Sequence, residues 1–319
     1  MIKNPWIIIN PGATGAVKTI AFFKGKKIKF SRVKSQASMS KILKNKLKKG
    51  HTNFIICGGD GTVNIFVQTY MKLPKKKRET IKVGFLPSGN GNDLVNALKM
   101  PLDIKKAYER VMKGRSKKID IIKVNKKYFI TGGTIGIVTE IAMEVDKWIA
   151  DMRKIKIQKT QIEEIDTLVS TLRKLLKPKT KDHFYYLSIV KRLFIGYKGI
   201  KGLKIDDRFY SDKVFTGVAI QNQEFIGKKF FFAPKASHSD GYFDIVIIRK
   251  SKDPLSDFIT LLNVVQGKHI NFKTVFRLRA KKATISTKSK EPFMADGEHM
   301  LESKKFKIST VPKAVSIYY

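Results

Sequence analysis

The chain has 319 residues, 42% of them apolar, so it is large enough for two domains with buried cores and is not a disordered chain. Lys and Arg number 65 against 26 Asp and Glu, which gives a net charge of +39. This excess favours an anionic partner, either nucleic acid or a negatively charged membrane surface. The lysines are nevertheless spread along the whole chain, as a lysine-rich genome would also produce.

Cysteine content and apolar runs bear on location. A single cysteine excludes an intrachain disulfide and a thiolate metal cluster. The N-terminal apolar run is too short for a signal peptide, and no run approaches the roughly 18 apolar residues of a transmembrane helix. We therefore expect a cytoplasmic protein whose contact with any membrane is peripheral.

Up to about residue 115, strand-like and helix-like segments alternate. Short apolar runs predict strands at Trp6–Ile9, 53–57 and Ile81–Leu86, and alternating basic and apolar residues predict an exposed edge strand at Lys27–Val33. Helical spacing and caps predict helices at Ser38–Lys48, at 63–71, from Leu94, and from Asp103 to Met112, with a basic loop at Pro74–Arg78. Repeated β–loop–α units predict a parallel sheet covered by helices, with ligands beyond the carboxyl ends of the strands.

From about Ser116 the pattern becomes that of a mostly antiparallel β domain. Strands are predicted at Ile119–Val124, Tyr128–Thr131, Val214–Ile220, Phe230–Ala233, Tyr242–Ile248, Thr274–Ala280 and Lys282–Thr287. One helical stretch, at about 140–176, interrupts them. It carries an apolar stripe opposite basic residues, formed by Leu168, Val169, Leu172, Leu175 and Leu176. Such a stripe packs on the protein's own core or lies on a membrane.

A glycine-rich turn with one carboxylate lies between a predicted strand and a predicted helix. It is the segment Cys57–Asn64, CGGDGTVN. Glycines leave backbone N–H groups uncovered, and such a turn before a helix is typical of an anion site. Asp60 adds a fixed negative charge where a cation could bridge phosphates. The segment therefore predicts a nucleotide phosphate site.

A second loop repeats this arrangement. The segment Leu86–Asp93, LPSGNGND, also follows an apolar strand and opens a helix. Gly89 and Gly91 allow close backbone approach, while the Asn and Asp side chains offer polar contacts or a helix cap. Two such loops at matching ends of adjacent parallel strands strengthen the prediction.

Two later turns also carry carboxylates. Asp296 and Glu298 flank a glycine, and either carboxylate could act as a general base, although an Asp-Gly pair is also typical of an ordinary hairpin. The segment Ser237–Tyr242 is either another hairpin turn or a place where Asp240 and nearby carbonyls hold a hard cation such as Mg²⁺. The five histidines show no paired metal spacing.

Together these segments resemble the diacylglycerol kinase catalytic family, especially its soluble bacterial lipid kinases, with sphingosine kinases and NAD kinases as relatives. The likeness covers essentially the whole chain, in order and spacing. The motifs that carry it are Ile8–Pro11, Gly58–Asn64, Leu86–Leu94, Ala233–Asp244 and Asp296–Glu298. The Gly58–Asn64 motif is shared with NAD kinases and some phosphofructokinases, whereas the second loop favours lipid kinases.

The resemblance implies a fold and a division into domains. Residues 1–122 would form an N-terminal α/β nucleotide-binding domain with a parallel sheet, similar to NAD kinases and phosphofructokinases. Residues 123–307 would form a larger, mainly antiparallel β-sandwich domain that supplies the lipid cleft. The segment 308–319 is expected to return to the first domain.

The resemblance also implies roles for individual residues. The ATP-binding set would be Asn10, Thr14, Gly58, Gly59, Asp60, Gly61, Thr62, Asn64, Gly89, Asn90, Asn92 and Asp93. Asp60 would act in catalysis beside the phosphates and Mg²⁺, and Asp296 or Glu298 would be the general base for the lipid hydroxyl. Ser237 and Tyr242, through their carbonyls, and Asp240 would hold a structural metal ion.

This chain departs from the family pattern at three places. Thr14 stands where the family has a glycine, because the glycines after the NP motif are shifted by one position. Ile65 replaces a common acidic residue, and Asn90 replaces a usual threonine. An Asn side chain can still donate a hydrogen bond to a phosphate or a base.

The function expected is that of an ATP- and Mg²⁺-dependent lipid kinase in phospholipid metabolism, acting on diacylglycerol or a related lipid. Its partners would be the lipid and an anionic membrane surface; no nucleic acid is expected, and a homodimer is left open. One alternative is a kinase of a soluble substrate, like an NAD kinase. The other is a non-catalytic basic binding protein on the same fold.

Overall fold

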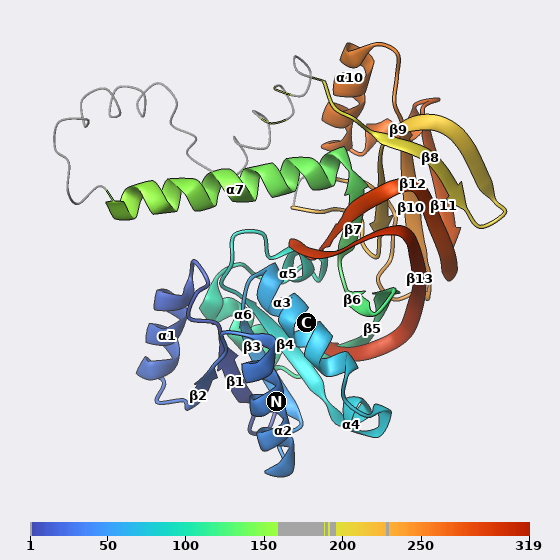
Figure 1. Ribbon diagram of the computed structural model, residues 1–319. Coiled ribbons are helices and arrows are strands. Elements are labelled where there is room, and N and C mark those ends of the chain that lie inside the picture. Colours follow the sequence, from blue (N-terminus) through green and yellow to red (C-terminus); the bar gives the residue numbers. More distant parts are fainter. Residues whose placement is uncertain (1, 159–187, 189–190, 192–195, 228–229) are drawn as a thin grey trace.

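The computed structural model describes residues 2–158, 188, 191, 196–227 and 230–319. Figure 1 shows the N-terminal elements gathered on one side and the C-terminal strands on the other. The strands of both parts belong to one continuous sheet.

The first part is built on a parallel sheet. β1 (Trp6–Ile9) pairs in parallel with β2 (Phe30–Arg32) on one side and with β3 (Asn53–Gly58) on the other. β4 (Lys82–Pro87) pairs in parallel with β3. The edge position of β2 agrees with its predicted exposure, since its residues are half-buried or exposed. The carboxyl ends of β3 and β4 therefore lie side by side, which brings the two glycine-rich loops together.

Helices pack beside this sheet. They are α1 (Ala16–Gly25), α2 (Gln36–Lys48), α3 (Asp60–Met71), α4 (Lys75–Thr80), α5 (Asp93–Ala97) and α6 (Ile104–Met112). Phe22 and Phe23 of α1 contact the ring of Tyr108 in α6 edge to face. α2 lies against α3. Asp103 caps α6 as predicted, since its side chain accepts a hydrogen bond from the backbone of Lys106.

Two local predictions in this part are corrected. The basic segment predicted as a loop at Pro74–Arg78 contains the helix α4, whose N-cap is Pro74. Its lysines do not oppose a helix because none of its residues is buried and water solvates their charges. In addition, α3 begins at Asp60 rather than at residue 63, which places that carboxylate in the first turn of the helix.

The second part is antiparallel. Its strands are β5 (Ser116–Val124), β6 (Lys127–Phe129), β7 (Gly132–Gly136), β8 (Ile200–Ile205), β9 (Phe209–Gln221), β10 (Phe243–Arg249), β11 (Val275–Ala280), β12 (Lys282–Ala295) and β13 (Glu298–Tyr318). β7 and β8 each pair with both β9 and β12, so these four strands close on themselves. The strand predicted at Phe230–Ala233 is wrong, because only a single bridge joins Phe230 to Ile226 there.

Helices interrupt the antiparallel part at two places. α7 (Ile137–Gln158) follows β7 and extends away from the C-terminal sheet, above the N-terminal elements in the view of Figure 1. It covers the first half of the predicted helical stretch, whose apolar stripe at 168–176 lies outside the described residues. α10 (Pro254–Val264), between β10 and β11, was not predicted. It contacts the first turns of α7 through a small apolar cluster that includes Ile141 and Leu261.

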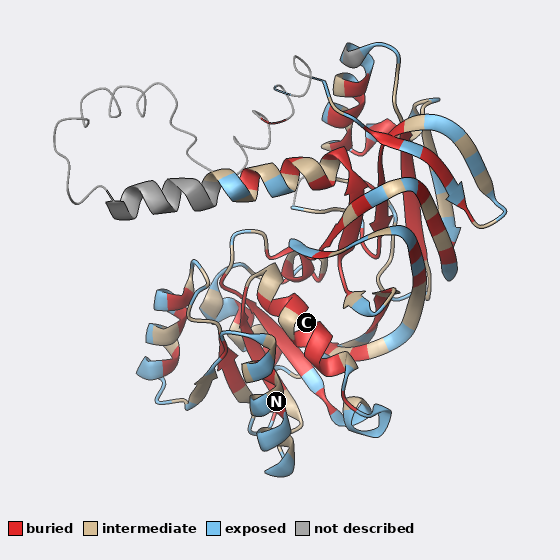
Figure 2. Cartoon of the chain, viewed as in Figure 1, coloured by how far each residue is buried: buried red, intermediate tan, exposed pale blue. Residues whose placement is uncertain are grey.

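Each part has its own apolar core, and Figure 2 shows the buried positions concentrated along the strands. One core joins β1, β3 and β4 to the helices, and the other lies among the antiparallel strands. β5 contributes to both, with Ile119 and Ile121 in the first core and Ile122 and Val124 in the second. The boundary predicted between residues 122 and 123 falls within β5 and stays a prediction.

The last strand links the two parts. β13 pairs with β12 at its beginning and in parallel with β4 at its end, where Ser316 lies opposite Lys82. Ile317 is fully buried in the first core, and the Tyr318 hydroxyl donates a hydrogen bond to Asn53. The end of the chain is therefore part of the parallel sheet.

None of the helices in the described part of the chain combines the length and the apolarity needed to cross a bilayer.

The return of the chain end to the first core can be tested with Ile317→Ala. We expect a loss of about 2–5 kcal/mol in the free energy of unfolding, because the substitution leaves a cavity in a fully buried position. Val17, which is 80% exposed, provides a control, since Val17→Ala should change stability by less than about 0.5 kcal/mol. Urea unfolding of both variants measures the difference, and equal stabilities would contradict the packing described.

Candidate active site

The first glycine-rich loop joins β3 to α3 and is hydrogen-bonded to the segment that follows β1. Gly58 ends β3, and a Cβ atom there would lie 2.2 Å from the Thr62 hydroxyl oxygen, so this position needs glycine. The Thr62 hydroxyl accepts a hydrogen bond from the Asn10 side chain (2.8 Å). The Asn10 carbonyl oxygen in turn accepts one from the backbone of Gly12 (2.9 Å). Asn10 thereby fixes the loop after β1 against the start of α3.

The second loop is held by its own asparagine. Asn92 adopts a left-handed conformation (φ 55°) and exchanges two hydrogen bonds with Gly89, accepting from its N–H (3.0 Å) and donating to its carbonyl (2.6 Å). A Cβ on Gly89 would lie 2.3 Å from the Cα of Gly59. The backbones of the two loops are thus in direct contact, and neither position can accept a side chain without moving the other loop.

Asp60 connects the two loops. Its Oδ1 accepts a hydrogen bond from the backbone of Asp93 (2.7 Å), and its Oδ2 fills the space where a Cβ of Gly91 would lie. The Asp93 carboxylate accepts a hydrogen bond from the backbone of Gly227 (2.7 Å), in the segment after β9. One chain of contacts therefore runs from α3 through α5 to the antiparallel part of the protein.

The environment of Asp60 is electrostatically unfavourable for its charged form. Burial and then the neighbouring Asp93 and Asp296 raise the pKa of Asp60 to about 7, and backbone hydrogen bonds from Asp93 and Asn92 only partly oppose this. Mg²⁺ binds negatively charged oxygen ligands, usually one or two protein carboxylates together with substrate phosphates. The residues present fit such an ion.

Asp296 lies in a two-residue hairpin turn between β12 and β13. Ala295 and Glu298 are paired, and Asp296 and Gly297 both have positive φ (50° and 75°), as such a turn requires. The expectation of an Asp-Gly hairpin is therefore confirmed. The turn does more than reverse the chain, because it lies against the first turn of α3, where Glu298 occupies the space beside Gly61.

Hydrogen bonds fix the Asp296 carboxylate from both parts of the protein. It accepts from the Asn64 side chain of α3 (3.1 Å), the backbone N–H of Ile130 (3.1 and 3.2 Å), and both the N–H (2.9 Å) and the hydroxyl (2.6 Å) of Thr131. Burial nevertheless raises the pKa of Asp296, although these hydrogen bonds oppose the shift. Glu298 is exposed. The turn thus presents one buried, oriented carboxylate and one exposed carboxylate.

The structure brings most of the predicted nucleotide and catalytic residues together. Contacts join Asn10 to Thr62, Gly59 to Gly89, Asp60 to Asp93, Asn64 to Asp296, and Gly61 to Glu298. Thr14 and Asn90 are exposed at the rim of these loops, Thr14 beside Gly15, whose N–H donates to Ser88 (2.7 Å). Their roles in nucleotide binding stay predictions.

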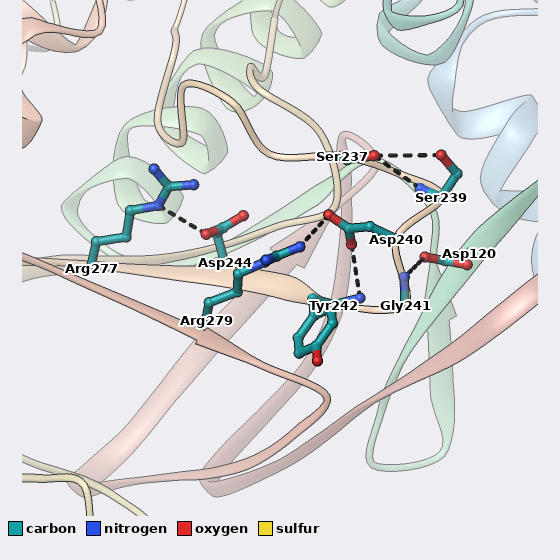
Figure 3. Close-up of polar contacts among 9 residues, drawn as sticks. All are labelled: Asp120, Ser237, Ser239, Asp240, Gly241, Tyr242, Asp244, Arg277 and Arg279. Atoms are coloured by element: carbon teal, nitrogen blue, oxygen red, sulfur yellow. Dashed lines mark hydrogen bonds and ion pairs between the residues drawn. The ribbon is translucent and has the colours of Figure 1, made fainter.

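Contacts among protein side chains and backbone hold the predicted metal turn at Ser237–Tyr242 (Figure 3). One Asp240 oxygen accepts from the backbone of Tyr242 (3.0 Å) and the other pairs with Arg279 (2.5 Å). The Arg279 guanidinium also lies over the Tyr242 ring, 4.3 Å from its centroid. A cation at Asp240 would have to compete with Arg279, so this arrangement does not fit the ion, and the metal role of the turn stays a prediction.

Sequence reasoning missed two residues that organise the site. Asp120 is fully buried in β5 and accepts hydrogen bonds from Gly241 (2.6 Å) and Lys313 (2.7 Å), which ties the 237–242 turn to β13. Thr131 supplies two of the donors to Asp296. An acidic residue inside an apolar strand was a usable signal for Asp120, whereas nothing in the sequence distinguishes Thr131.

Among the residues described, no three His, Cys, Asp or Glu side chains form a group that could hold a metal ion. A magnesium ion bound through one or two carboxylates and substrate phosphates does not require such a group.

Two family models match the chain. Residues 6–124 match the model of the diacylglycerol kinase catalytic domain, and residues 165–319 match that of the YegS C-terminal NAD kinase beta sandwich-like domain. The first covers the parallel sheet, both glycine-rich loops and β5. The second covers the 237–242 turn, the Asp296 hairpin and the returning end of β13.

Curated relatives agree with these matches. The chain is 29% identical to a diacylglycerol kinase from Staphylococcus carnosus (strain TM300) over 268 residues, which are 80% of this chain and 73% of that protein. It is also 29% identical over 261 residues to a diacylglycerol kinase from Staphylococcus aureus (strain Newman), covering 78% of this chain and 70% of the relative.

Solved structures share the fold. A diacylglycerol kinase from Bacillus anthracis str. Sterne superposes with a TM-score of 0.68 at 18% identity, covering 100% of this chain and 98% of that one. Another chain from the same organism gives a TM-score of 0.71 at 20% identity with the same coverage. The likeness extends through both parts of the protein, including the C-terminal β-sandwich domain.

The contact between the two loops can be tested with Gly89→Ala. We expect a loss of about 1–3 kcal/mol in stability and weaker binding of ATP, because the new methyl group would push against the Gly59 backbone. Gly25→Ala is the matched control: nothing lies within 4 Å of its new methyl group, so stability should be unchanged or slightly higher. Thermal unfolding with and without ATP measures both effects, and equal behaviour of the two variants would contradict the contact.

The raised pKa of Asp60 predicts how stability depends on pH. The folded protein holds this proton more tightly than the unfolded chain, so the Asp60 carboxyl lowers stability progressively as pH rises from about 4 to about 7. Asp60→Asn keeps the acceptor oxygen but removes the charge. Without nucleotide and Mg²⁺, the variant should be more stable than the wild type by up to about 4 kcal/mol above pH 7 and equally stable near pH 4. Thermal unfolding across this range tests it, and a variant less stable at pH 8 would refute it.

Proposed function

Because the chain belongs to the diacylglycerol kinase catalytic family and is a lipid kinase, we propose that it transfers the γ-phosphoryl group of ATP to the hydroxyl of diacylglycerol or a closely related lipid. The observation that carries this proposal is the position of the Asp296 hairpin, which places two carboxylates against the first turn of α3 between the glycine-rich loops. The acceptor is inferred from the names of the curated relatives.

The nucleotide would bind across the two loops. Their glycines leave backbone N–H groups uncovered at the N-terminus of α3, where the helix dipole favours phosphate. Asn10 and Thr62 fix the first loop, and Asn92 fixes the second. Phosphoryl transfer requires alignment of the phosphates more than covalent participation of the protein, and these contacts supply a rigid support for it.

Mg²⁺ would be held by Asp60 together with the ATP phosphates. The ion, when bound, neutralises charge on the phosphates. Asp60 is suited to this role because burial and two neighbouring carboxylates disfavour its negative charge in the absence of a cation. The Asp93 N–H fixes one of its oxygens and so orients the other.

The proton of the lipid hydroxyl would pass to the Asp296–Glu298 turn. We assign Asp296 as the base, because burial raises the pKa of its carboxyl, which makes the carboxylate a stronger base, and five hydrogen-bond contacts fix its orientation. Glu298 lies at the exposed side of the same turn, where it can orient the acceptor hydroxyl. A base in this position increases the nucleophilicity of the hydroxyl as it approaches the γ-phosphorus.

The setting proposed for this reaction is the cytoplasmic face of a membrane, with the enzyme bound peripherally. The surplus of 39 positive charges supports attraction to anionic lipids.

The two carboxylates of the turn can be separated by mutation. We expect Asp296→Asn to lower kcat by about 10²–10⁴-fold, as loss of a general base does, with little change in the KM for ATP. Glu298→Gln should lower kcat less and raise the KM for the lipid. The measurement is transfer of labelled phosphate from ATP to diacylglycerol in mixed micelles, with circular dichroism to confirm folding of each variant.

Each result of this assay has a consequence. A larger loss of kcat in Glu298→Gln than in Asp296→Asn would reverse the two roles. Wild-type protein that transfers phosphate to a soluble acceptor such as NAD, but to no lipid, would refute the proposed acceptor. Wild-type activity in both Asp60→Ala and Asp296→Ala would refute the proposed site.

A further inference from the structure

α10 presents apolar side chains to solvent along its whole length. Leu255, Ile259 and Leu262 are 53%, 43% and 36% exposed. Their spacing of four and three residues places them on one face of the helix, over a length of about 10 Å. We call these three residues the α10 stripe. They are three of the seven large apolar side chains that are exposed in the described residues, and the only ones of the seven that share an element.

The stripe is separate from the face with which α10 packs on the protein. The opposite face buries Leu261 and Val264 against neighbouring elements, with Leu261 in the cluster formed with α7. Asp257 also points inward, where it accepts hydrogen bonds from Tyr197 (2.6 Å) and Ser251 (2.8 Å). The protein's own packing therefore explains one face of α10 and leaves the stripe unexplained.

The charges at the ends of α10 are basic. Lys252 precedes the helix, and Lys268 and Lys273 follow it, all three exposed. Asp253, an exposed acidic residue at the start of α10, caps the helix by accepting hydrogen bonds from Leu255 and Ser256. Apolar side chains between exposed lysines are the pattern of a helix that lies in the interface of an anionic bilayer.

We propose that the α10 stripe is a docking surface for an anionic lipid bilayer. Leu255, Ile259 and Leu262 enter the boundary between headgroups and acyl chains, and Lys252, Lys268 and Lys273 contact the anionic headgroups. A second copy of the chain fits less well, because two copies joined through the stripe would bring the same lysines together across the contact.

The position of α10 suits this role. It packs on the beginning of α7, which directly follows β7, and β7 begins at Gly132, whose carbonyl accepts a hydrogen bond from Asp296 (3.2 Å). The contact between α10 and α7 is thus separated from the proposed catalytic turn by one strand of five residues, about 17 Å long. Figure 1 shows α10 at the outer end of the C-terminal part, away from the parallel sheet.

Vesicle binding without ATP tests the surface. The probes are vesicles of phosphatidylglycerol and phosphatidylcholine, and vesicles of phosphatidylcholine alone, in a co-sedimentation assay. The wild type should bind the anionic vesicles, and the triple variant L255Q/I259Q/L262Q should bind them about ten-fold more weakly. The variant V17Q/L102Q is the control: it removes two exposed apolar side chains elsewhere, 80% and 52% exposed, and should bind like the wild type.

A charge variant tests the other half of the surface. K252Q/K268Q/K273Q should bind anionic vesicles several-fold more weakly, and its remaining binding should depend less on salt than that of the wild type. A control that replaces Lys75, Lys76 and Lys77 by Gln removes the same charge from the exposed helix α4 and should have a smaller effect.

The outcomes separate this proposal from the proposed function, on which its biological meaning rests. Kinase activity in mixed micelles should be the same in the triple variant and in the wild type, while activity on vesicles should fall with binding. Absence of kinase activity with stripe-dependent vesicle binding would refute the function and leave the surface standing. Unchanged vesicle binding by the triple variant, or a wild-type dimer that the triple variant converts to monomer, would overturn the proposed surface.

Discussion

The arrangement of the site depends on the hydrogen bonds that the Asp296 carboxylate accepts. This carboxylate is buried between the two parts of the protein and receives hydrogen bonds from Asn64 of α3 on one side and from Ile130 and Thr131 on the other. A buried carboxylate requires such donors, because its desolvation would otherwise cost several kcal/mol. The two parts therefore have to meet in one orientation, and β13, which starts at this turn, extends from there into the parallel sheet.

Bringing Asp296 to this position places it near two other carboxylates, and their mutual repulsion is unfavourable. Asp60, Asp93 and Asp296 lie close enough that the last two raise the pKa of the first. In a protein with a net charge of +39, such a concentration of negative charge in one place stands out. Structural carboxylates are normally paired with bases, whereas carboxylates that repel one another favour the binding of a cation. The mutual repulsion of these carboxylates is therefore consistent with a site shaped for a metal–nucleotide complex.

Local features of the sequence predicted the strands and loops well, and features that depend on distant residues poorly. The apolar runs and glycines around Asp60 and Gly89 predicted the parallel strands and both loops, because turn geometry and strand burial depend on residues adjacent in the sequence. The role of Thr131 could not be found, since its partner Asp296 is 165 positions away and any small polar residue would look the same. Two predictions from composition were wrong. The charged segment after Pro74 forms a helix instead of a loop, and the apolar segment from Phe230 forms a single bridge instead of a strand.

The distribution of charge and apolar surface suggests two separate steps in reaching a lipid. In the proposed setting, lysines spread along the whole chain would attract the protein to an anionic membrane, but a diffuse charge cannot select one orientation. An apolar face can, because it gains free energy only when it is turned toward the acyl chains. The proposed reaction needs that orientation, since the lipid hydroxyl would have to arrive at the turn around Asp296 rather than anywhere on the surface. Long-range attraction and local insertion are thus complementary, and neither alone would bring the hydroxyl into line with the γ-phosphorus.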